Sequence, residues 1–163
     1  MKEFKESMRL ALPLDKAFDL VFNDPQVLKF MHAKNGFDAT PWEDNKRVVK
    51  FTLPHDDMPP VLVKIVGGGK LSVTTKQHIK HADAKRVHVE NKVKPHVLGA
   101  EFVKIRPTFT LTQKEDKTTQ FDITCKLCAI MPPPFNSIME GFMLVASKAN
   151  YAWFREALTQ HSI

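Results

Sequence analysis

Three polar residues interrupt the apolar faces of strand-like segments: Thr75, Gln77 and Asn91. Apolar residues occupy every second position around them, in LSV (71–73) and in VHVENKV (87–93), so the three side chains should face the same interior as their neighbours. A buried polar group without a partner costs about 1–3 kcal/mol. These side chains therefore either bond to one another and to the backbone, or line a wet cavity that holds the hydroxyl or headgroup of a ligand.

The residue types that build metal and redox sites are few and poorly placed. In FDITCKLCAIM, strand-like alternation directs Cys125 and Cys128 to opposite faces, about 10 Å apart at about 3.3 Å per residue, which is too far for a disulfide or a shared metal. His78 and His88 would face each other across a hairpin whose turn centres on Asp83, but a metal site needs a third ligand. No GxSxG, HExxH or paired-carboxylate pattern occurs. We expect no metal, no cofactor and no catalytic residue.

Residues 61–94 carry the whole excess of positive charge. The chain has 24 basic and 18 acidic residues, and this segment holds eight of the basic residues but only two of the acidic ones, leaving 16 of each elsewhere. A solvated strand face explains this pattern, and so does a surface for an anionic membrane or another polyanion. The membrane-facing residues would then be Lys64, Lys70, Lys76, Lys80, Arg86 and Lys92. Nucleic acid is not expected, because no aromatic residues are interleaved for stacking.

Hydrophobic periodicity predicts one strand, two short helices, about six more strands and one long helix. The first strand is 2–10, and the two short helices are 15–23 and 24–34. The further strands are expected near 37–43, 46–53, 61–66, 70–81, 84–94, 103–113 and 119–131.

The last helix, 135–161, has apolar residues at the spacing of one buried stripe: Phe135, Ile138, Phe142, Val145, Ala149 and Trp153. Gly141 in its middle costs about 1 kcal/mol relative to alanine, so a close contact is expected there. The element order predicts an α+β fold, with residues 1–163 forming one domain. Its curved antiparallel sheet wraps around the long C-terminal helix, which leaves a cavity between sheet and helix.

Several motifs fit a known superfamily over nearly the whole chain. They are Trp42-Glu43, Arg47 and an aromatic followed by Leu53-Pro54 within residues 41–60, Gln77 on the downstream hairpin, and the final helix FNSIMEGFMLVASKANYAWF. With these motifs the chain resembles the helix-grip (START-like, SRPBCC) superfamily of lipid and small-ligand carriers, and within it the VASt sterol-transfer domains. The resemblance implies binding, and with it transfer, of a sterol or other lipid in the cavity. The alternatives are a cyclase- or hydrolase-type enzyme of the same fold, and a ligand-free protein-interaction module.

The segment PHDDMPP (54–60) follows the strand that ends at Leu53. Its three prolines stiffen it at low entropic cost, and Met58 provides a flexible apolar tip. It is either a lip that shields the cavity and touches a membrane, or a plain connection. Strand parity, the helix stripe and this loop give the expected ligand-binding residues: Phe51, Leu53, Met58, Val73, Thr75, Gln77, Val89, Asn91, Phe109, Ile123, Ile138, Phe142 and Val145.

The expected location is cytoplasmic, at most peripheral to membranes. The longest apolar run, FMLVA at 142–146, is far too short to span a bilayer, and the first residues lack the apolar core of a signal peptide. Two free cysteines fit a reducing compartment. The expected partners are a lipid or sterol ligand and, transiently, an anionic membrane surface.

Overall fold

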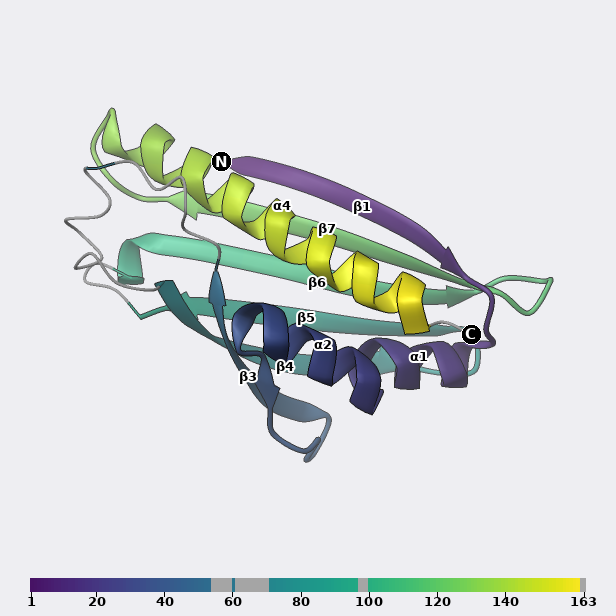
Figure 1. The fold of residues 1–163 in the computed structure, drawn as a ribbon. Coiled ribbons are helices and arrows are strands. Elements are labelled where there is room, and N and C mark those ends of the chain that lie inside the picture. Colours follow the sequence, from purple (N-terminus) through teal and green to yellow (C-terminus); the bar gives the residue numbers. More distant parts are fainter. Residues whose placement is uncertain (54–59, 61–70, 97–99, 162–163) are drawn as a thin grey trace.

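Seven antiparallel strands form one curved sheet in the computed structural model, which describes residues 1–53, 60, 71–96 and 100–161 (Figure 1). The order across the sheet is β1-β7-β6-β5-β4-β3-β2, so every neighbouring pair except β1 and β7 is consecutive in sequence. The strands are β1 Lys2–Leu10, β2 Asp38–Ala39, β3 Lys46–Leu53, β4 Leu71–Ala82, β5 Arg86–Pro95, β6 Val103–Gln113 and β7 Thr119–Ala129. The predicted fold class is confirmed.

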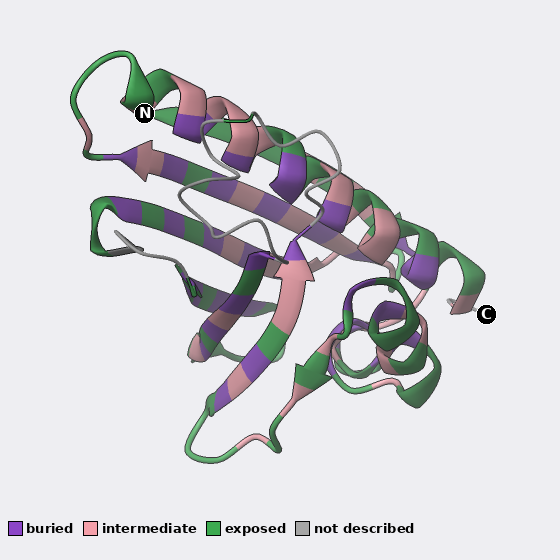
Figure 2. Ribbon diagram, turned by 60° about the vertical axis from the view of Figure 1, so that its left-hand side comes forward, coloured by how far each residue is buried: buried purple, intermediate pink, exposed green. Residues whose placement is uncertain are grey.

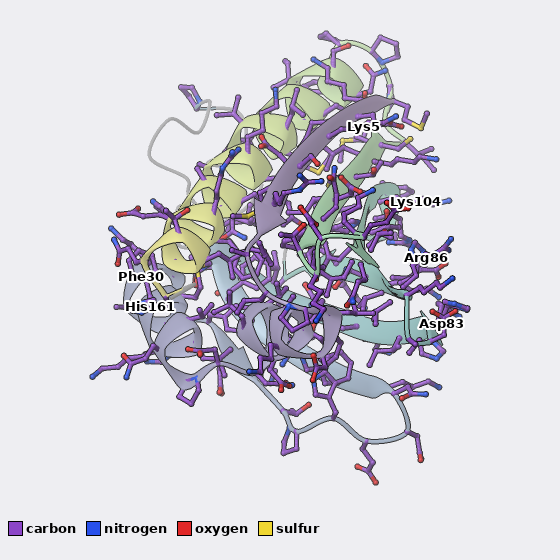
Figure 3. The ribbon with its side chains drawn as sticks, turned by 90° about the vertical axis from the view of Figure 1, so that its right-hand side faces the viewer. Lys5, Phe30, Asp83, Arg86, Lys104 and His161 are labelled. Atoms are coloured by element: carbon purple, nitrogen blue, oxygen red, sulfur yellow. The ribbon has the colours of Figure 1, made fainter. Side chains whose placement is uncertain are left out.

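Three longer helices cover one face of the sheet, hereafter the inner face, in the described part of the chain. They are α1 (Leu14–Phe22), α2 (Pro25–Asn35) and α4 (Phe135–His161), and a single 3-10 turn, η1 (Ala100–Phe102), precedes β6. Figure 1 shows α4 crossing the sheet diagonally, with α2 and α1 lying one after the other next to its C-terminal half. The opposite, outer face carries no helix among the described residues (Figure 3).

The sequence signals that delimit the short helices differ between α1 and α2. Asp24 caps α2, because its Oδ1 accepts from the backbone N–H groups of Gln26 and Val27 at 2.8 and 3.1 Å. Gly36 ends α2 with a φ of 71°, a left-handed conformation that glycine adopts without strain. α1 lacks a side-chain cap of its own; instead the Leu14 N–H donates to Oε1 of the distant Gln113 at 2.8 Å. The helix pair is thereby tied to the end of β6.

Burial alternates along the strands as the sequence pattern predicts (Figure 2). The inward residues are almost all buried, including Val49, Val73, Val93, Ile105, Leu111, Phe121, Cys125 and Leu127. All of these except Val49 belong to two core clusters, one under α1, α2 and the end of α4, and the other under the start of α4. Among the described residues, no helix is long and apolar enough to cross a bilayer.

The stripe predicted for the last helix is wrong. The buried positions of α4 are Met139, Glu140, Met143, Ala146, Ser147, Asn150, Ala157 and Leu158. Val145 of the predicted stripe is 60% exposed and Phe135 45% exposed. The buried face of α4 is therefore rotated by about one residue from the predicted face. The prediction counted only large apolar residues, whereas the buried face includes small and polar ones such as Ala146, Ser147 and Asn150.

Two smaller expectations also fail. A β-bulge between Ile79 and His81 shifts the register of the β4–β5 hairpin, so that His88 pairs with His81 and His78 pairs with Glu90. The strand expected at 37–43 is only the two residues of β2. The strand expected at 61–66 lies outside the described residues.

Candidate functional site

A cavity of about 60 Å³ lies on the inner face, where the two core clusters meet. Its walls come from α1 and α2, from β3, β4, β5 and β6, and from α4. Aromatic side chains dominate the walls: Phe22, Phe37, Phe51, Phe109, Tyr151 and Phe154. The polar lining residues are Arg47, Thr75, Gln77, Asn91 and Asn150. The cavity therefore combines an aromatic wall with a few polar groups, the usual composition of a small-molecule site.

Three of the polar residues form one row across neighbouring strands. Arg47 of β3 pairs directly with Gln77 of β4, and Gln77 pairs directly with Asn91 of β5. Directly opposite side chains on one face have Cβ atoms about 4.5–5.5 Å apart. The sheet thus places a cation and two amides side by side on its inner face.

Arg47 is the buried charge of this row, with 6% of its surface exposed. Its Nε donates to Oε1 of Gln77 at 2.6 Å, and its Nη1 donates to the carbonyl of Phe22, the last residue of α1, at 2.6 Å. The guanidinium carbon lies 4.6 Å from the centre of the Trp42 ring and 5.6 Å from that of Phe22. Burial lowers the pKa of Arg47 to about 10, so the side chain stays charged at neutral pH.

The orientation of Asn91 follows from Pro107 in the middle of β6. Pro107 has no N–H for the ladder with β5, and Nδ2 of Asn91 donates to its carbonyl at 3.1 Å. Since a carbonyl only accepts, Asn91 must direct its own Oδ1 elsewhere. In the part of the chain that the structure describes, this oxygen is buried without a hydrogen-bond partner, as is Oγ1 of Thr75. Internal bonding therefore satisfies the predicted polar residues only in part.

The helix side of the cavity is held by a second amide pair. Nδ2 of Asn35 in α2 donates to Oδ1 of Asn150 in α4 at 2.6 Å, while Oδ1 of Asn35 accepts from the Phe37 N–H at 3.0 Å. Tyr151 packs edge-on against Phe109 with ring centroids 5.9 Å apart. Burial raises the pKa of the Tyr151 hydroxyl well above its usual value, so it remains protonated.

The structure brings together five of the predicted ligand-binding residues: Phe51, Thr75, Gln77, Asn91 and Phe109 line the cavity. Four others are buried in the adjoining core, namely Leu53, Val73, Val89 and Ile123. Ile138 and Phe142 are half-buried against the cluster under the start of α4, and Val145 faces outward. Met58, with residues 54–59, lies outside the described residues.

Sequence reasoning missed Arg47, Asn150 and Tyr151 as lining residues. In KRVVKFTL, Arg47 shares the parity of Val49 and Phe51, so extending the inward list by one step would have found it. Asn150 and Tyr151 were hidden by the misplaced helix stripe. A stripe that included small and polar residues would have included Asn150.

The outer face of the sheet is rich in basic side chains. Lys76 of β4 and Lys92 of β5 pair directly on it. With Lys46 and Lys80 they line an open groove of about 780 Å³, whose lining also includes Glu43, Asp44 and Glu90 and reaches Arg47 and Gln77. Figure 3 shows Lys5, Arg86 and Lys104 projecting from the side of the sheet away from α4. Four of the six residues predicted to face a membrane are thus exposed, and Lys64 and Lys70 lie outside the described residues.

The sequence matches no protein-family model and no curated protein. Solved structures nevertheless match the chain along nearly its whole length. The Zhui aromatase/cyclase from Streptomyces sp. R1128 matches with a TM-score of 0.67 at 10% identity, over 99% of this chain and 93% of that one. A START superfamily protein from Mycobacterium smegmatis matches with a TM-score of 0.53 at 9% identity, over 96% and 93%. The chain has the helix-grip fold.

A protein from Thermus thermophilus also matches, with a TM-score of 0.66 at 12% identity over 99% of this chain and 97% of that one. At such identities the likeness to helix-grip proteins shows the fold alone. The closer likeness to VASt domains stays a prediction. Evidence about the ligand must come from this chain's own cavity.

Proposed function

We propose that this protein binds one small amphipathic molecule in the cavity between the sheet and α4. The observation that supports the proposal is the pair of buried, unpartnered oxygens, Thr75 Oγ1 and Asn91 Oδ1, in an aromatic-lined cavity. Each costs about 1–3 kcal/mol while it lacks a partner. A ligand that supplies a hydroxyl or a water-like group there would recover that cost, and its apolar body would pack against the rings.

The size of the cavity limits the ligand in the observed conformation. About 60 Å³ holds a few water molecules, since one water needs about 10–15 Å³ in this measure. Sites for drug-sized ligands are typically about 300–1,000 Å³. A sterol or other lipid, the ligand class implied by the resemblance, therefore requires the walls to move apart. A compact aromatic molecule requires less movement.

Titration with neutral N-phenyl-1-naphthylamine, a fluorescent sterol and a fluorescent fatty acid tests this proposal. Saturable binding at one site per chain is expected, strongest for the compact probe. Thr75→Leu removes the unpartnered hydroxyl and extends a larger apolar side chain into the cavity, so it is expected to weaken uptake. Thr74→Leu, one residue away on the outer face, is the matched control and should leave uptake unchanged. No saturable uptake of any probe would refute the proposal.

An enzyme is the second candidate, because the similar Streptomyces protein is named an aromatase/cyclase. In this chain Tyr151 and Arg47 are the groups that would donate a proton or stabilise negative charge beside a bound molecule. The test is mass spectrometry of the ligand recovered from the protein after short and long incubation. A changed product mass favours the enzyme, and an unchanged ligand favours a carrier.

We propose further that the basic outer face contacts anionic membranes. Lys76, Lys80, Arg86 and Lys92 support this, because each basic residue near an anionic surface contributes about 1 kcal/mol. Cosedimentation with phosphatidylserine liposomes should fall as salt rises, since the attraction is screened. Equal binding to neutral liposomes at every salt concentration would contradict it.

A further inference from the structure

Arg47 carries a buried positive charge at the wall of the cavity. Among the residues that the structure describes, no Asp or Glu forms an ion pair with it. Two of the five guanidinium N–H groups are used, toward Gln77 and the Phe22 carbonyl. A buried cation without a counter-ion is costly, and such charges are normally paired.

The groups around Arg47 explain where its side chain lies, but they do not neutralise its full positive charge. The Phe22 carbonyl at the C-terminal end of α1 contributes a partial negative charge, and the rings of Trp42 and Phe22 contribute their faces. These groups carry only partial negative charges, so they do not neutralise the guanidinium. Binding the end of α1 also does not require Arg47 to line the cavity. A structural role therefore explains the two bonds that Arg47 makes and leaves Nη2 without a described partner.

The amide of Gln77 is oriented in a way that complements an anion. Oε1 of Gln77 faces Arg47, so its Nε2, which only donates, is directed elsewhere, and no described residue accepts from it. Arg47 and Gln77 thus offer donors from two directly paired positions, while the next residue in the row, Asn91, offers an unused acceptor. Two adjacent donors suit the two oxygens of a carboxylate.

We propose that the molecule bound in the cavity carries a single carboxylate that pairs with Arg47 and Gln77, and a hydroxyl or amine that donates to Asn91. The inference rests on the proposed function, since it names the ligand class of the same cavity. One buried cation matches one negative charge, which favours a carboxylate over a doubly charged phosphate. The aromatic wall favours an aromatic acid over a fatty acid.

NMR titration with matched acids and amides separates this inference from the proposed function. The probes are 4-hydroxybenzoate against 4-hydroxybenzamide, and octanoate against octanamide, which differ in charge but hardly in shape. Each acid is expected to bind at least about tenfold more tightly than its amide, the usual contribution of a charge-assisted hydrogen bond. If no probe shifts the signals of the cavity residues, the proposed function fails. If the amides bind as well as the acids, only the carboxylate inference fails.

Gln77→Glu provides the missing counter-ion next to Arg47, because Oε1 already lies 2.6 Å from Nε. This variant should raise the melting temperature of the ligand-free protein and lower the affinity for each acid at least about tenfold. The affinity for each amide should fall much less, because an amide carries no charge for the new carboxylate to repel, so the preference for the acid is lost. Lys92→Gln on the outer face changes the net charge by the same amount and is the matched control. An acid affinity that falls equally in both variants, or in neither, would overturn the inference.

Discussion

Arg47 donates from Nε to Oε1 of Gln77 at 2.6 Å, across two directly paired positions of β3 and β4. Gln77 therefore both lines the cavity and fixes the position of the Arg47 side chain. The bond also holds the guanidinium against the end of α1, where it donates to the Phe22 carbonyl. The sheet edge, the first helix and the cavity are therefore coupled through one side chain.

Gln77→Leu and Thr75→Val are expected to change stability in opposite directions. Removing Gln77 deprives buried Arg47 of a hydrogen bond, which is worth about 1.5–3 kcal/mol when one partner is charged. Thr75→Val removes an unpartnered hydroxyl at nearly constant shape, so the ligand-free protein should keep its stability or gain up to about 1 kcal/mol. Urea unfolding of both variants measures this. A gain in stability for Gln77→Leu would contradict the account of Arg47.

Gly141→Ala should stabilise the protein by about 1 kcal/mol, because glycine in a helix interior is unfavourable by that amount. Among the described residues the close contact expected at Gly141 is absent: an added Cβ would lie 3.8 Å from Nζ of Lys2, an ordinary contact with a flexible side chain. Gly36→Ala is the contrasting variant. At a φ of 71° alanine is strained, so stability should fall by about 1–2 kcal/mol. Thermal unfolding that ranks the two variants the other way would refute this.

The two cysteines should differ in reactivity. Burial raises the pKa of the Cys125 thiol to about 12, and it faces the inner core, whereas Cys128 is half-buried on the other side of β7. Since the thiolate is the reactive form, Cys125 should react with a thiol reagent at pH 8 only as fast as the protein unfolds. Cys128→Ser isolates Cys125 for the measurement. Fast labelling of that variant in the folded state would show that the core is open there.

Glu140 should make stability depend on pH in the acid range. The Ala129 N–H donates to its Oε2 at 3.0 Å, and the amine of Met1 lies 3.1 Å from Oε1, which together lower the pKa of the carboxyl. A lowered folded-state pKa means that this stabilisation is present above the ordinary value of 4.5 and is lost as the pH falls through the folded-state value.

Glu140→Gln is the control, because it keeps an acceptor for Ala129 but cannot titrate. The stability difference between the natural protein and this variant should shrink as the pH drops from 6 to 3. A constant difference across that range would show that the carboxylate charge contributes nothing.

The sequence predicted the sheet far better than the helix surface. Strand parity depends only on alternation, so Thr75, Gln77 and Asn91 were placed correctly on the inner face. The face of α4 depended on counting apolar residues, and its buried side includes Glu140, Ser147 and Asn150, which bond or pack in ways no hydropathy count reveals. Hydrogen-bond pairing is likewise invisible in sequence.

The register of β4 and β5 shows the same limit. Because of the bulge after Ile79, His88 pairs with His81 and not with His78, the pairing that the sequence predicts. No residue type in the hairpin predicts this bulge. Pro107 is the opposite case. A proline in a central strand argues against that strand, yet the Asn91 side chain bonds to its carbonyl and β6 continues.

Native mass spectrometry of the purified protein tests most directly whether the cavity binds a ligand. Spectra are compared before and after solvent extraction, and again after adding 4-hydroxybenzoate, for the natural chain and for Thr75→Leu. The account predicts one small molecule per chain, removed by extraction, restored by the added acid and reduced in Thr75→Leu. The bare chain mass in every sample, with no shift on adding the acid or a neutral probe, would contradict it.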